Sequence, residues 1–288
     1  CTMQLARRGY HVTLAEADNK LGGRVLFESG LKGLSAWKRV SDNRIYEIQQ
    51  KNNIEIYKES ELTLSHINEL GINNIFLATG SSWRKDGVGR SRRKPVQGLE
   101  SLQVLTPEEA IKQSPNLSGP IVVYDDEQGY LAGVIADHLS FDEHEVIFIT
   151  PASVVSPWTE STLEQKRIQK ALLVSGVNVI CNKTIDKAEG SNLNLKCVFT
   201  GEISLLKCSS LVMVTERIPN TTLYDQLVEQ ENNTEQGEAK HIQLIGDAES
   251  PGLIADAVFL GHLAAQSFEE PEQEIQKAMF MREMPSLK

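Results

Sequence analysis

A chain of 288 residues, 40 % hydrophobic and 24 % charged, is long enough for two globular domains. Its net charge of −10 makes it a poor partner for nucleic acid or an anionic membrane, and no apolar run approaches the length of a membrane span. The four cysteines form no CxxC pair and have no metal-ligand spacing, so we expect reduced thiols in a cytoplasmic protein and no metal or iron–sulfur cluster ligated within this chain.

The chain opens with a predicted helix over residues 1–8, which Gly9 ends, and a predicted strand over residues 11–16. A helix, a glycine, a strand and a terminal acidic residue form the second half of a dinucleotide-binding βαβ unit. Glu16 is that acidic residue, and its carboxylate can accept hydrogen bonds from an adenosine ribose. A solvated glutamate at a strand end would give the same pattern. Because the helix begins at the first residue, we expect the preceding strand and glycine-rich turn to lie outside this sequence.

Two adjacent glycines, Gly22 and Gly23, precede Arg24. Glycine pairs allow positive φ and close approach of a ligand to the backbone, and an arginine there can lie beside a pyrophosphate or a flavin edge. An ordinary turn with an exposed arginine is the alternative, but the spacing from Glu16 favours the nucleotide site. We add Leu62, in the connection after a predicted strand over residues 54–57, to the candidate cofactor-binding residues.

Two later turns complete the candidate site. An apolar strand over residues 75–78 runs into Thr79 and Gly80, where such a strand meets a cofactor in dinucleotide folds. Another over residues 242–245 runs into Gly246 and Asp247 and then into an apolar helix, whose N-terminus favours a negatively charged ligand. A Gly-Asp-Ala turn is common by chance, so it supports a nucleotide site only because it follows the other candidate motifs in the order that the fold requires.

The stretch from residue 84 to 94 is strongly basic, with Arg84, Lys85, Arg90, Arg92, Arg93 and Lys94. A solvated loop explains this composition, and a docking surface for an acidic partner or a cofactor phosphate is the functional alternative. A nucleic-acid role would need interleaved aromatic residues, which Trp83 alone does not supply.

A second strand–helix–strand pattern covers residues 120–150, and a predicted hairpin follows over residues 193–207. In a nicotinamide-binding domain, a glycine-rich turn after the first strand would hold the pyrophosphate with backbone amides. Here Asp125, Asp126 and Glu127 occupy that turn. Because carboxylates repel a pyrophosphate, we predict that this domain keeps the fold but binds NAD(P)H poorly.

With these motifs placed, the chain resembles the C-terminal half of the trimethylamine dehydrogenase and 2,4-dienoyl-CoA reductase family of iron–sulfur flavoproteins. The residues that carry the resemblance are Leu5–Tyr10, the strand to Glu16, Leu21–Arg24, Phe76–Gly80, Val154–Thr159 and Ile245–Ala248. Val154–Thr159 and the acidic turn favour the amine dehydrogenase branch. Within it, Trp83–Arg90 and Met281–Pro285 are most similar to dimethylglycine-type demethylating dehydrogenases.

The resemblance implies an α/β fold with two Rossmann-like, glutathione-reductase-like domains, the second inserted in the first. The first domain, residues 1–115 and 241–288, would bind FAD or ADP and lack its first strand. The second, residues 116–240, would be NAD(P)-binding-like with a degenerate glycine motif. Glu16 would contact the adenosine ribose, Gly23 and Arg24 the pyrophosphate side, and Thr79, Gly80 and Asp247 would lie further along the ligand.

The same resemblance implies that the chemistry belongs to an N-terminal TIM-barrel half with FMN, the substrate pocket and a [4Fe–4S] cluster. No catalytic residue of the family can be assigned to this chain. We expect an oxidoreductase that demethylates a small N-methyl amine, passes electrons to an electron-transfer flavoprotein and forms a homo-oligomer. The alternatives are an NAD(P)H-dependent flavin reductase of the dienoyl-CoA reductase type and a non-catalytic nucleotide-binding module.

Overall fold

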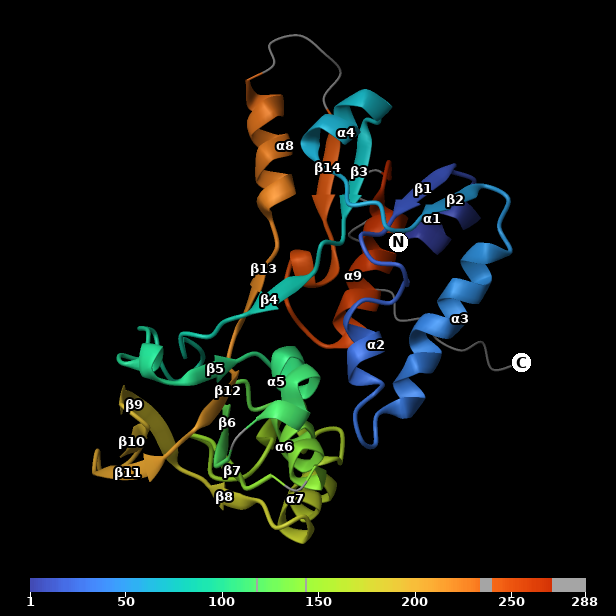
Figure 1. Ribbon diagram of the computed structural model, residues 1–288. Coiled ribbons are helices and arrows are strands. Elements are labelled where there is room, and N and C mark those ends of the chain that lie inside the picture. The colour runs from blue at the N-terminus through green and yellow to red at the C-terminus, as the bar shows by residue number, and fades with distance from the viewer. Residues whose placement is uncertain (118, 143, 234–239, 271–288) are drawn as a thin grey trace. The chain divides into compact units, whose positions relative to one another are not determined.

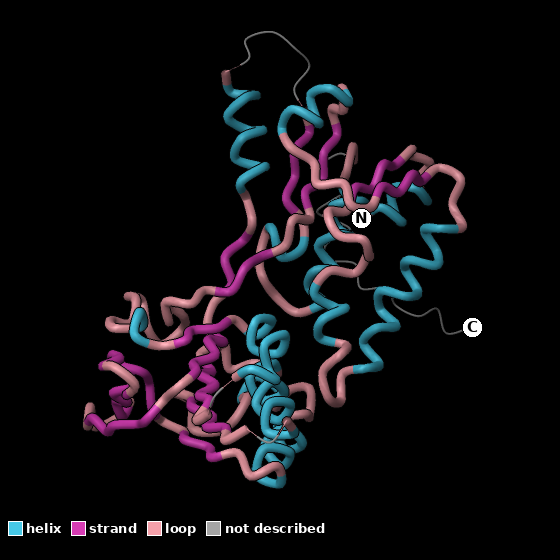
Figure 2. The backbone as a smooth tube through the Cα atoms, viewed as in Figure 1, coloured by secondary structure: helices cyan, strands magenta, loops and turns pink. Residues whose placement is uncertain are grey.

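The computed structural model describes residues 1–117, 119–142, 144–233 and 240–270, which fall into two compact units (Figures 1 and 2). Unit 1 comprises Cys1–Leu26, Trp37–Ser81 and the described residues from Pro219 onward, and unit 2 comprises Phe27–Ala36 and Ser82–Ile218. The chain changes units near residues 81 and 218, not near the predicted 115 and 240. The reason is strand pairing and helix packing: residues 103–105 join the sheet of unit 2, and a helix over residues 222–232 packs in unit 1.

Unit 1 contains two parallel strand pairs, β1 with β2 and β3 with β14. Its strands and helices are β1 (Val12–Ala15), β2 (Ile54–Tyr57), β3 (Asn74–Leu77), β14 (His241–Leu244), α1 (Thr2–Arg7), α3 (Lys38–Gln49), α4 (Leu64–Leu70), α8 (Thr222–Asn232) and α9 (Ile254–Ser267). Helix α2 (Arg24–Glu28) begins in unit 1 and ends in unit 2.

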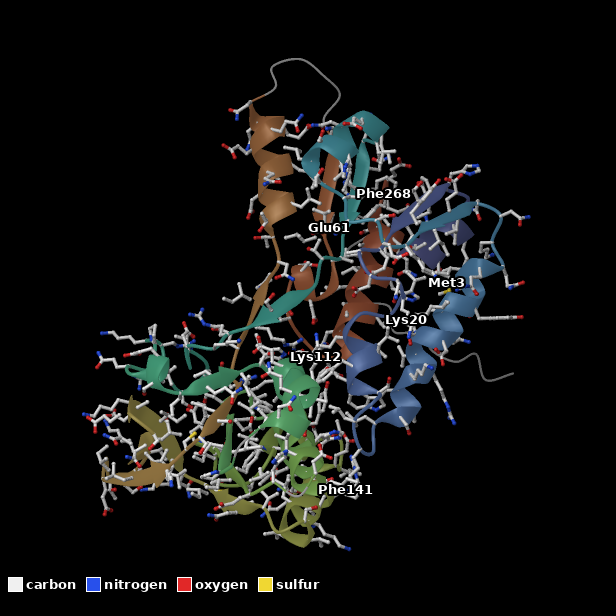
Figure 3. All side chains as sticks on the ribbon, in the orientation of Figure 1. Met3, Lys20, Glu61, Lys112, Phe141 and Phe268 are labelled. Atoms are coloured by element: carbon white, nitrogen blue, oxygen red, sulfur yellow. The ribbon has the colours of Figure 1, made fainter. Side chains whose placement is uncertain are left out.

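One layer of helices connects the two strand pairs of unit 1. Val12 of β1 and Phe76 of β3 pack against the same buried cluster, which α1 and α9 supply through Leu5 and Ala265 together with Phe268. Phe268, labelled in Figure 3, meets the Phe76 ring edge-on with a centroid distance of 5.4 Å. The opposite face of β3 packs against a separate cluster that includes Ile67 of α4. Two parallel strand pairs under one helical layer agree with the predicted Rossmann-like, α/β architecture.

Unit 2 is built on a five-stranded parallel sheet in the order β5-β12-β6-β7-β8. Its elements are β5 (Gln103–Leu105), α5 (Pro107–Gln113), β6 (Ile121–Asp125), α6 (Leu131–Phe141), β7 (Val146–Ile149), α7 (Gln165–Val174), β8 (Asn178–Ile180) and β12 (Ser210–Val214). Strands β6, β7 and β12 are buried along their whole length, including the polar Asp125 at the end of β6 and Ser210 at the start of β12. Their apolar runs over residues 121–124, 146–149 and 211–214 predict this burial. Beside this sheet stands an antiparallel one of β9 (Lys183–Glu189), β10 (Asn192–Cys197) and β11 (Ile203–Lys207).

The two segments where the chain changes units pair with each other, as β4 (Ser81–Trp83) and β13 (Arg217–Pro219). Of the antiparallel sheet, the hairpin β10–β11 is confirmed, whereas its third strand β9 was not predicted. Residues 229–232 are the end of α8, and residues 234–239 lie outside the described part of the chain. None of the helices in the described residues combines the length and hydropathy that a membrane span requires.

Candidate functional site

Glu16 stands directly after β1, at the position where a dinucleotide fold presents its ribose-binding acid. Its backbone N–H donates to the Tyr57 carbonyl at 2.8 Å, which extends the pairing of β1 with β2 by one residue. Its carboxylate accepts a hydrogen bond from the Asp18 backbone N–H at 3.0 Å. The side chain is half-buried, so one carboxylate oxygen is fixed while the group keeps contact with solvent.

Gly22 and Gly23 form the turn before α2, and both have positive φ, 131° and 50°. A Cβ on Gly22 would approach Leu26 Cγ to 3.0 Å, so that glycine is needed for packing. A Cβ on Gly23 would meet no atom within 4 Å, and this residue is exposed. Gly23 therefore presents bare backbone to solvent, which is what a phosphate-binding turn requires.

Arg24 and Asp247 meet in unit 1, although 223 positions separate them in the sequence. The Arg24 guanidinium lies 3.5 Å from Asp247 Oδ2 and donates to the Gly252 carbonyl at 2.8 Å. Asp247 Oδ1 in turn accepts from the Gly252 N–H at 3.1 Å, and the Ser81 hydroxyl lies 3.4 Å from Oδ2. The network fixes the turn before α9 against the glycine turn of the first segment.

Thr79 and Gly80 are held by a residue that sequence reasoning missed, Asn220. The Thr79 hydroxyl donates to the Asn220 carbonyl at 2.5 Å, and the Asn220 N–H donates to the Gly80 carbonyl at 2.9 Å. The Leu62 side chain packs against the apolar cluster around Ile67, so its described contacts are structural. Any ligand contact at Leu62 would have to use its backbone.

The structure thus brings Gly22–Arg24 together with Gly246–Asp247 and the Thr79–Gly80 turn together with Asn220. Glu16 takes no part in either network. Ser81, Asn220 and Gly252 were missed because their contacts join segments far apart in the sequence, and those of Asn220 and Gly252 use backbone atoms, which residue type does not reveal.

The acidic turn in unit 2 lies between β6 and α6 and differs from the predicted arrangement. Asp125 and Asp126 are fully buried, and Glu127 lies 3.5 Å from the Arg217 guanidinium. Burial raises the pKa of the Asp125 carboxyl well above its usual range and raises that of Asp126 in the same direction. These acids therefore do not form the open, charged surface on which the predicted repulsion of pyrophosphate depended.

Most of the basic stretch from residue 84 to 94 is engaged within unit 2. Arg84 is paired with both oxygens of Asp86, Lys85 with Glu109, and Arg92 donates to three backbone carbonyls. Arg90 stacks over the Trp158 ring at 5.0 Å. Only the exposed Arg93 and Lys94 face solvent without an internal contact among the described residues, which favours the structural interpretation of this stretch.

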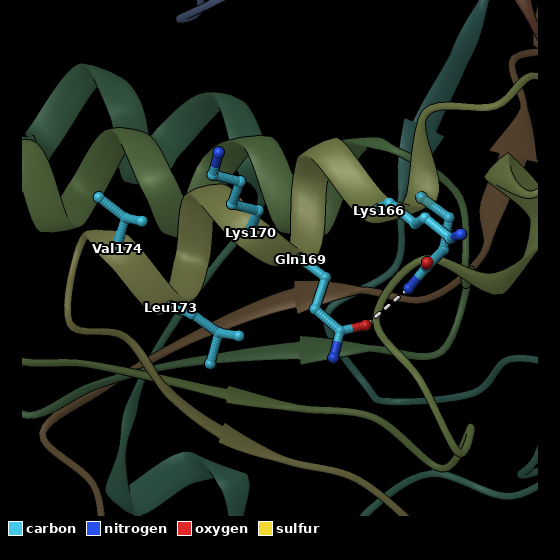
Figure 4. A pocket seen from close by; sticks show the side chains of 6 residues that line it. Lys166, Gln169, Lys170, Leu173 and Val174 are labelled. Carbon is cyan, nitrogen blue, oxygen red and sulfur yellow. Dashed lines mark hydrogen bonds between the residues drawn. The ribbon is translucent and has the colours of Figure 1, made fainter.

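A shallow concavity of about 410 Å³ lies beside α7 (Figure 4). Its lining comes from one face of α7 and includes Lys166, Lys170, Leu173 and Val174. None of the candidate nucleotide-binding residues lines it. Within the described residues, no group of three or more His, Cys, Asp or Glu could hold a metal ion.

Known proteins with similar sequences and structures include enzymes that act on amines. Dimethylamine dehydrogenase of Hyphomicrobium sp. (strain x) is 27 % identical over 302 aligned residues, which cover 96 % of this chain and 41 % of that protein. Histamine dehydrogenase from Rhizobium sp. 4-9 superposes with a TM-score of 0.90 at 38 % identity over 94 % of this chain and 42 % of the other. An amine oxidase for 6-hydroxypseudooxynicotine from Pseudomonas geniculata N1 gives a TM-score of 0.87 at 31 % identity, with coverages of 93 % and 40 %.

This chain spans about two fifths of the length of those relatives. The predicted resemblance to amine dehydrogenases and the predicted α/β, Rossmann-like fold are confirmed; the finer likeness to dimethylglycine-type enzymes stays a prediction. Residues 1–259 match the family model described as pyridine nucleotide-disulphide oxidoreductase. The chain belongs to the pyridine nucleotide-disulphide oxidoreductase family.

Proposed function

We propose that this chain is the nucleotide-binding portion of an amine-oxidising flavin and iron–sulfur dehydrogenase. The observation that supports the proposal most is the TM-score of 0.90 at 38 % identity to histamine dehydrogenase, over nearly the whole chain. The reaction would be the oxidative demethylation of a small N-methyl amine. A TIM-barrel portion with FMN and a [4Fe–4S] cluster would supply that redox chemistry, and an electron-transfer flavoprotein would accept the electrons from the homo-oligomeric protein.

The residues of unit 1 fit an adenine nucleotide. Glu16 offers a half-buried carboxylate for the ribose hydroxyls, and Gly22 and Gly23 offer a turn with positive φ for the diphosphate side. The α9 N-terminus adds a favourable potential for negative charge near Gly246 and Asp247. Thr79, Gly80 and the Leu62 backbone would complete the site.

Between ADP and FAD, the contacts of Asp247 favour ADP. Its carboxylate accepts from the Gly252 N–H, faces the Arg24 guanidinium and lies near the Ser81 hydroxyl. Both carboxylate oxygens therefore already have polar contacts within this chain. A ligand that continued from the diphosphate into a ribityl chain would compete for this carboxylate. A ligand that ends at the diphosphate would leave the network intact.

The test is the identity of the nucleotides released by denaturation from the protein expressed with its whole reading frame, by chromatography and mass spectrometry. We expect FMN and ADP in equal amounts. FMN with FAD would overturn the ADP assignment and favour the flavin reductase alternative. FMN alone would show that the residues named above do not form a nucleotide site.

The alternative enzyme, an NAD(P)H-dependent reductase, makes a separate prediction. It requires rapid bleaching of the flavin absorbance when NADPH is added without oxygen. We expect that NADPH leaves the flavin oxidised, whereas a secondary or tertiary methylamine reduces it. Reduction by NADPH at a rate comparable to turnover would decide for the reductase.

A further inference from the structure

The backbone N–H groups of the turn between β6 and α6 donate hydrogen bonds to acceptors within unit 2. The N–H groups of Asp126 and Glu127 both donate to the Val214 carbonyl, at 2.9 Å and 3.0 Å. The next N–H, of Gln128, donates to Asp125 Oδ1 at 2.7 Å. In a dinucleotide-binding turn these donors point at the ligand phosphates. Here three successive donors already have acceptors supplied by the chain.

The carboxyl of Asp125 is built into this turn. It is fully buried, and its second oxygen has no hydrogen-bond partner among the described residues. Gln128 reaches it by adopting a φ of 65°, unusual for a residue other than glycine. The turn therefore carries a local conformational cost in order to place its N–H on an internal carboxyl and not toward solvent.

The outer side of the turn is covered by two further segments of unit 2. Asp126 accepts from the Ser91 N–H at 2.9 Å, and a Cβ on Gly89 would lie 2.4 Å from Asp126 Oδ2, so this loop sits tightly on the turn. Arg90 Nε donates to the Glu127 carbonyl at 3.1 Å and its guanidinium stacks on Trp158.

Trp158 also contacts the turn directly, because its backbone N–H donates to the Gln128 carbonyl at 3.2 Å. On the helix side, Tyr130 donates to the buried Glu28 carboxylate at 2.7 Å. At the end of β7, where such a fold presents its ribose-binding acid, the fully buried Thr150 accepts from the Ala152 N–H at 3.2 Å.

We propose that unit 2 contains a dinucleotide turn closed by its own side chains. The Asp125 carboxyl takes the hydrogen-bond position that a ligand phosphate would take at Gln128, and the Arg90–Trp158 pair covers the turn. The chain then has one nucleotide site, in unit 1. Asp125 excludes a nicotinamide dinucleotide because its carboxyl takes the place of a phosphate, and not because it repels one. This proposal does not depend on which nucleotide unit 1 holds.

Amide hydrogen exchange, read residue by residue in the full protein, tests the closed turn. We expect slow exchange at the amides of Asp126, Glu127 and Gln128. D125A should speed exchange at Gln128 at least tenfold while the two amides bonded to Val214 stay slow. D125N keeps an acceptor oxygen and should keep Gln128 slow, and E160A, an exposed carboxylate removed near Trp158, should change nothing. Fast exchange at all three amides in the unaltered protein would overturn the proposal.

A ligand titration gives the second measurement. NADH and NADPH, added up to millimolar concentration, should leave exchange over residues 124–131 unchanged in the unaltered protein and in D125N. Saturable slowing of exchange in that segment would show that the turn opens to a dinucleotide, and the proposal would fail. If D125A does not fold, this titration still decides.

The two proposals fail separately. Absence of ADP binding would refute the site in unit 1 and would not touch the exchange pattern of the turn in unit 2. Protection of residues 124–131 by NADPH would refute the closed turn even if ADP binds in unit 1.

Discussion

The glycine turn of unit 1 follows β1 and its terminal Glu16, whereas the acidic turn of unit 2 follows β6, the first strand of its strand–helix–strand pattern. The backbones of the two turns differ in their exposure. Gly23 leaves its backbone bare, with open space where a side chain would begin. The turn at Asp125–Gln128 buries its donors against the Asp125 carboxyl and the Val214 carbonyl. The two turns thus differ in backbone exposure, while the parallel sheet of unit 2 is stabilised by its own apolar core.

The largest expected effect is the difference in stability between two glycine substitutions, one in α6 of unit 2 and one in the glycine turn of unit 1. A Cβ on Gly133, in the first turn of α6, would lie 2.4 Å from Ile168 Cγ2. We expect G133A to lower the free energy of unfolding by about 2–3 kcal/mol through overpacking. G23A, which meets open space but keeps a positive φ, should cost about 1 kcal/mol. Urea-unfolding midpoints measure both, and equal losses would contradict the contrast.

The functional side of the comparison is tested at Glu16. We expect E16A to weaken ADP binding by about 1.5–3 kcal/mol, the range for a hydrogen bond to a charged group, with little change in stability. Isothermal titration calorimetry measures the affinity. The matched control is E55A, an exposed carboxylate on the neighbouring strand β2, which should bind ADP normally. An unchanged affinity in E16A would remove Glu16 from the site.

The pH dependence of stability should identify the buried carboxyl of unit 2. Burial raises the pKa of Asp125 in the folded state, so its contribution to stability is fully present below the unfolded pKa of about 4. That contribution is lost, at up to about 1.4 kcal/mol per pH unit, as pH rises toward the folded pKa. D125N lacks this loss, so it should gain stability relative to the unaltered protein between pH 5 and 8 in urea titrations. Asp126, Glu127 and Arg90 are unchanged in both proteins.

D86N is the control of opposite sign. The hydrogen bonds from Arg84 lower the pKa of Asp86, so its contribution is present at neutral pH and lost as pH falls. The stability that D86N loses relative to the unaltered protein should therefore be larger at pH 7 than at pH 3. A D125N difference that did not vary with pH would show that Asp125 is ionised in the folded state.

The smallest expected effect is the coupling between Arg90 and Trp158. A cation–π pair at a partly exposed site contributes about 0.5–1 kcal/mol. A double-mutant cycle with R90A and W158A, which removes the aromatic ring, should recover a coupling of that size in urea unfolding. The same cycle with R93A, an exposed arginine three residues away, should give a coupling near zero.

Much of the fold could be predicted because buried parallel strands leave a plain signature. The runs at residues 121–124, 146–149 and 211–214 are apolar without interruption, and each lies in a buried strand. Strand β9 was missed because it carries Lys183, Asp186 and Lys187, and its place depends on pairing with β10. Short polar helices such as α5 and α8 were missed for a similar reason, since tertiary packing selects them.

The sequence predicted which residues belong to the candidate site but not which of them contact one another. Residue type suggested Gly22–Arg24 and Gly246–Asp247, yet nothing in the sequence shows that Arg24 and Asp247 meet. The acidic turn gives the sharper lesson. Three adjacent carboxylates suggested repulsion, whereas burial of Asp125 and Asp126 turned two of them into internal hydrogen-bond acceptors. Charge counted from sequence assumes ionised, solvated groups, and burial removes that assumption.

Unit 2 is not a single insertion into unit 1, because the separate segment Phe27–Ala36 also belongs to it. This segment follows the glycine turn of unit 1, yet Glu28 bonds Tyr130 and Lys32 pairs with Asp137 at 3.0 Å within unit 2. The chain therefore changes units at four points, after residues 26, 36, 81 and 218. A protease cutting only near residues 81 and 218 would release a unit 2 stripped of these contacts. Neither unit can be transferred to another protein as one continuous segment, because each unit is built from segments that the other unit separates in the sequence.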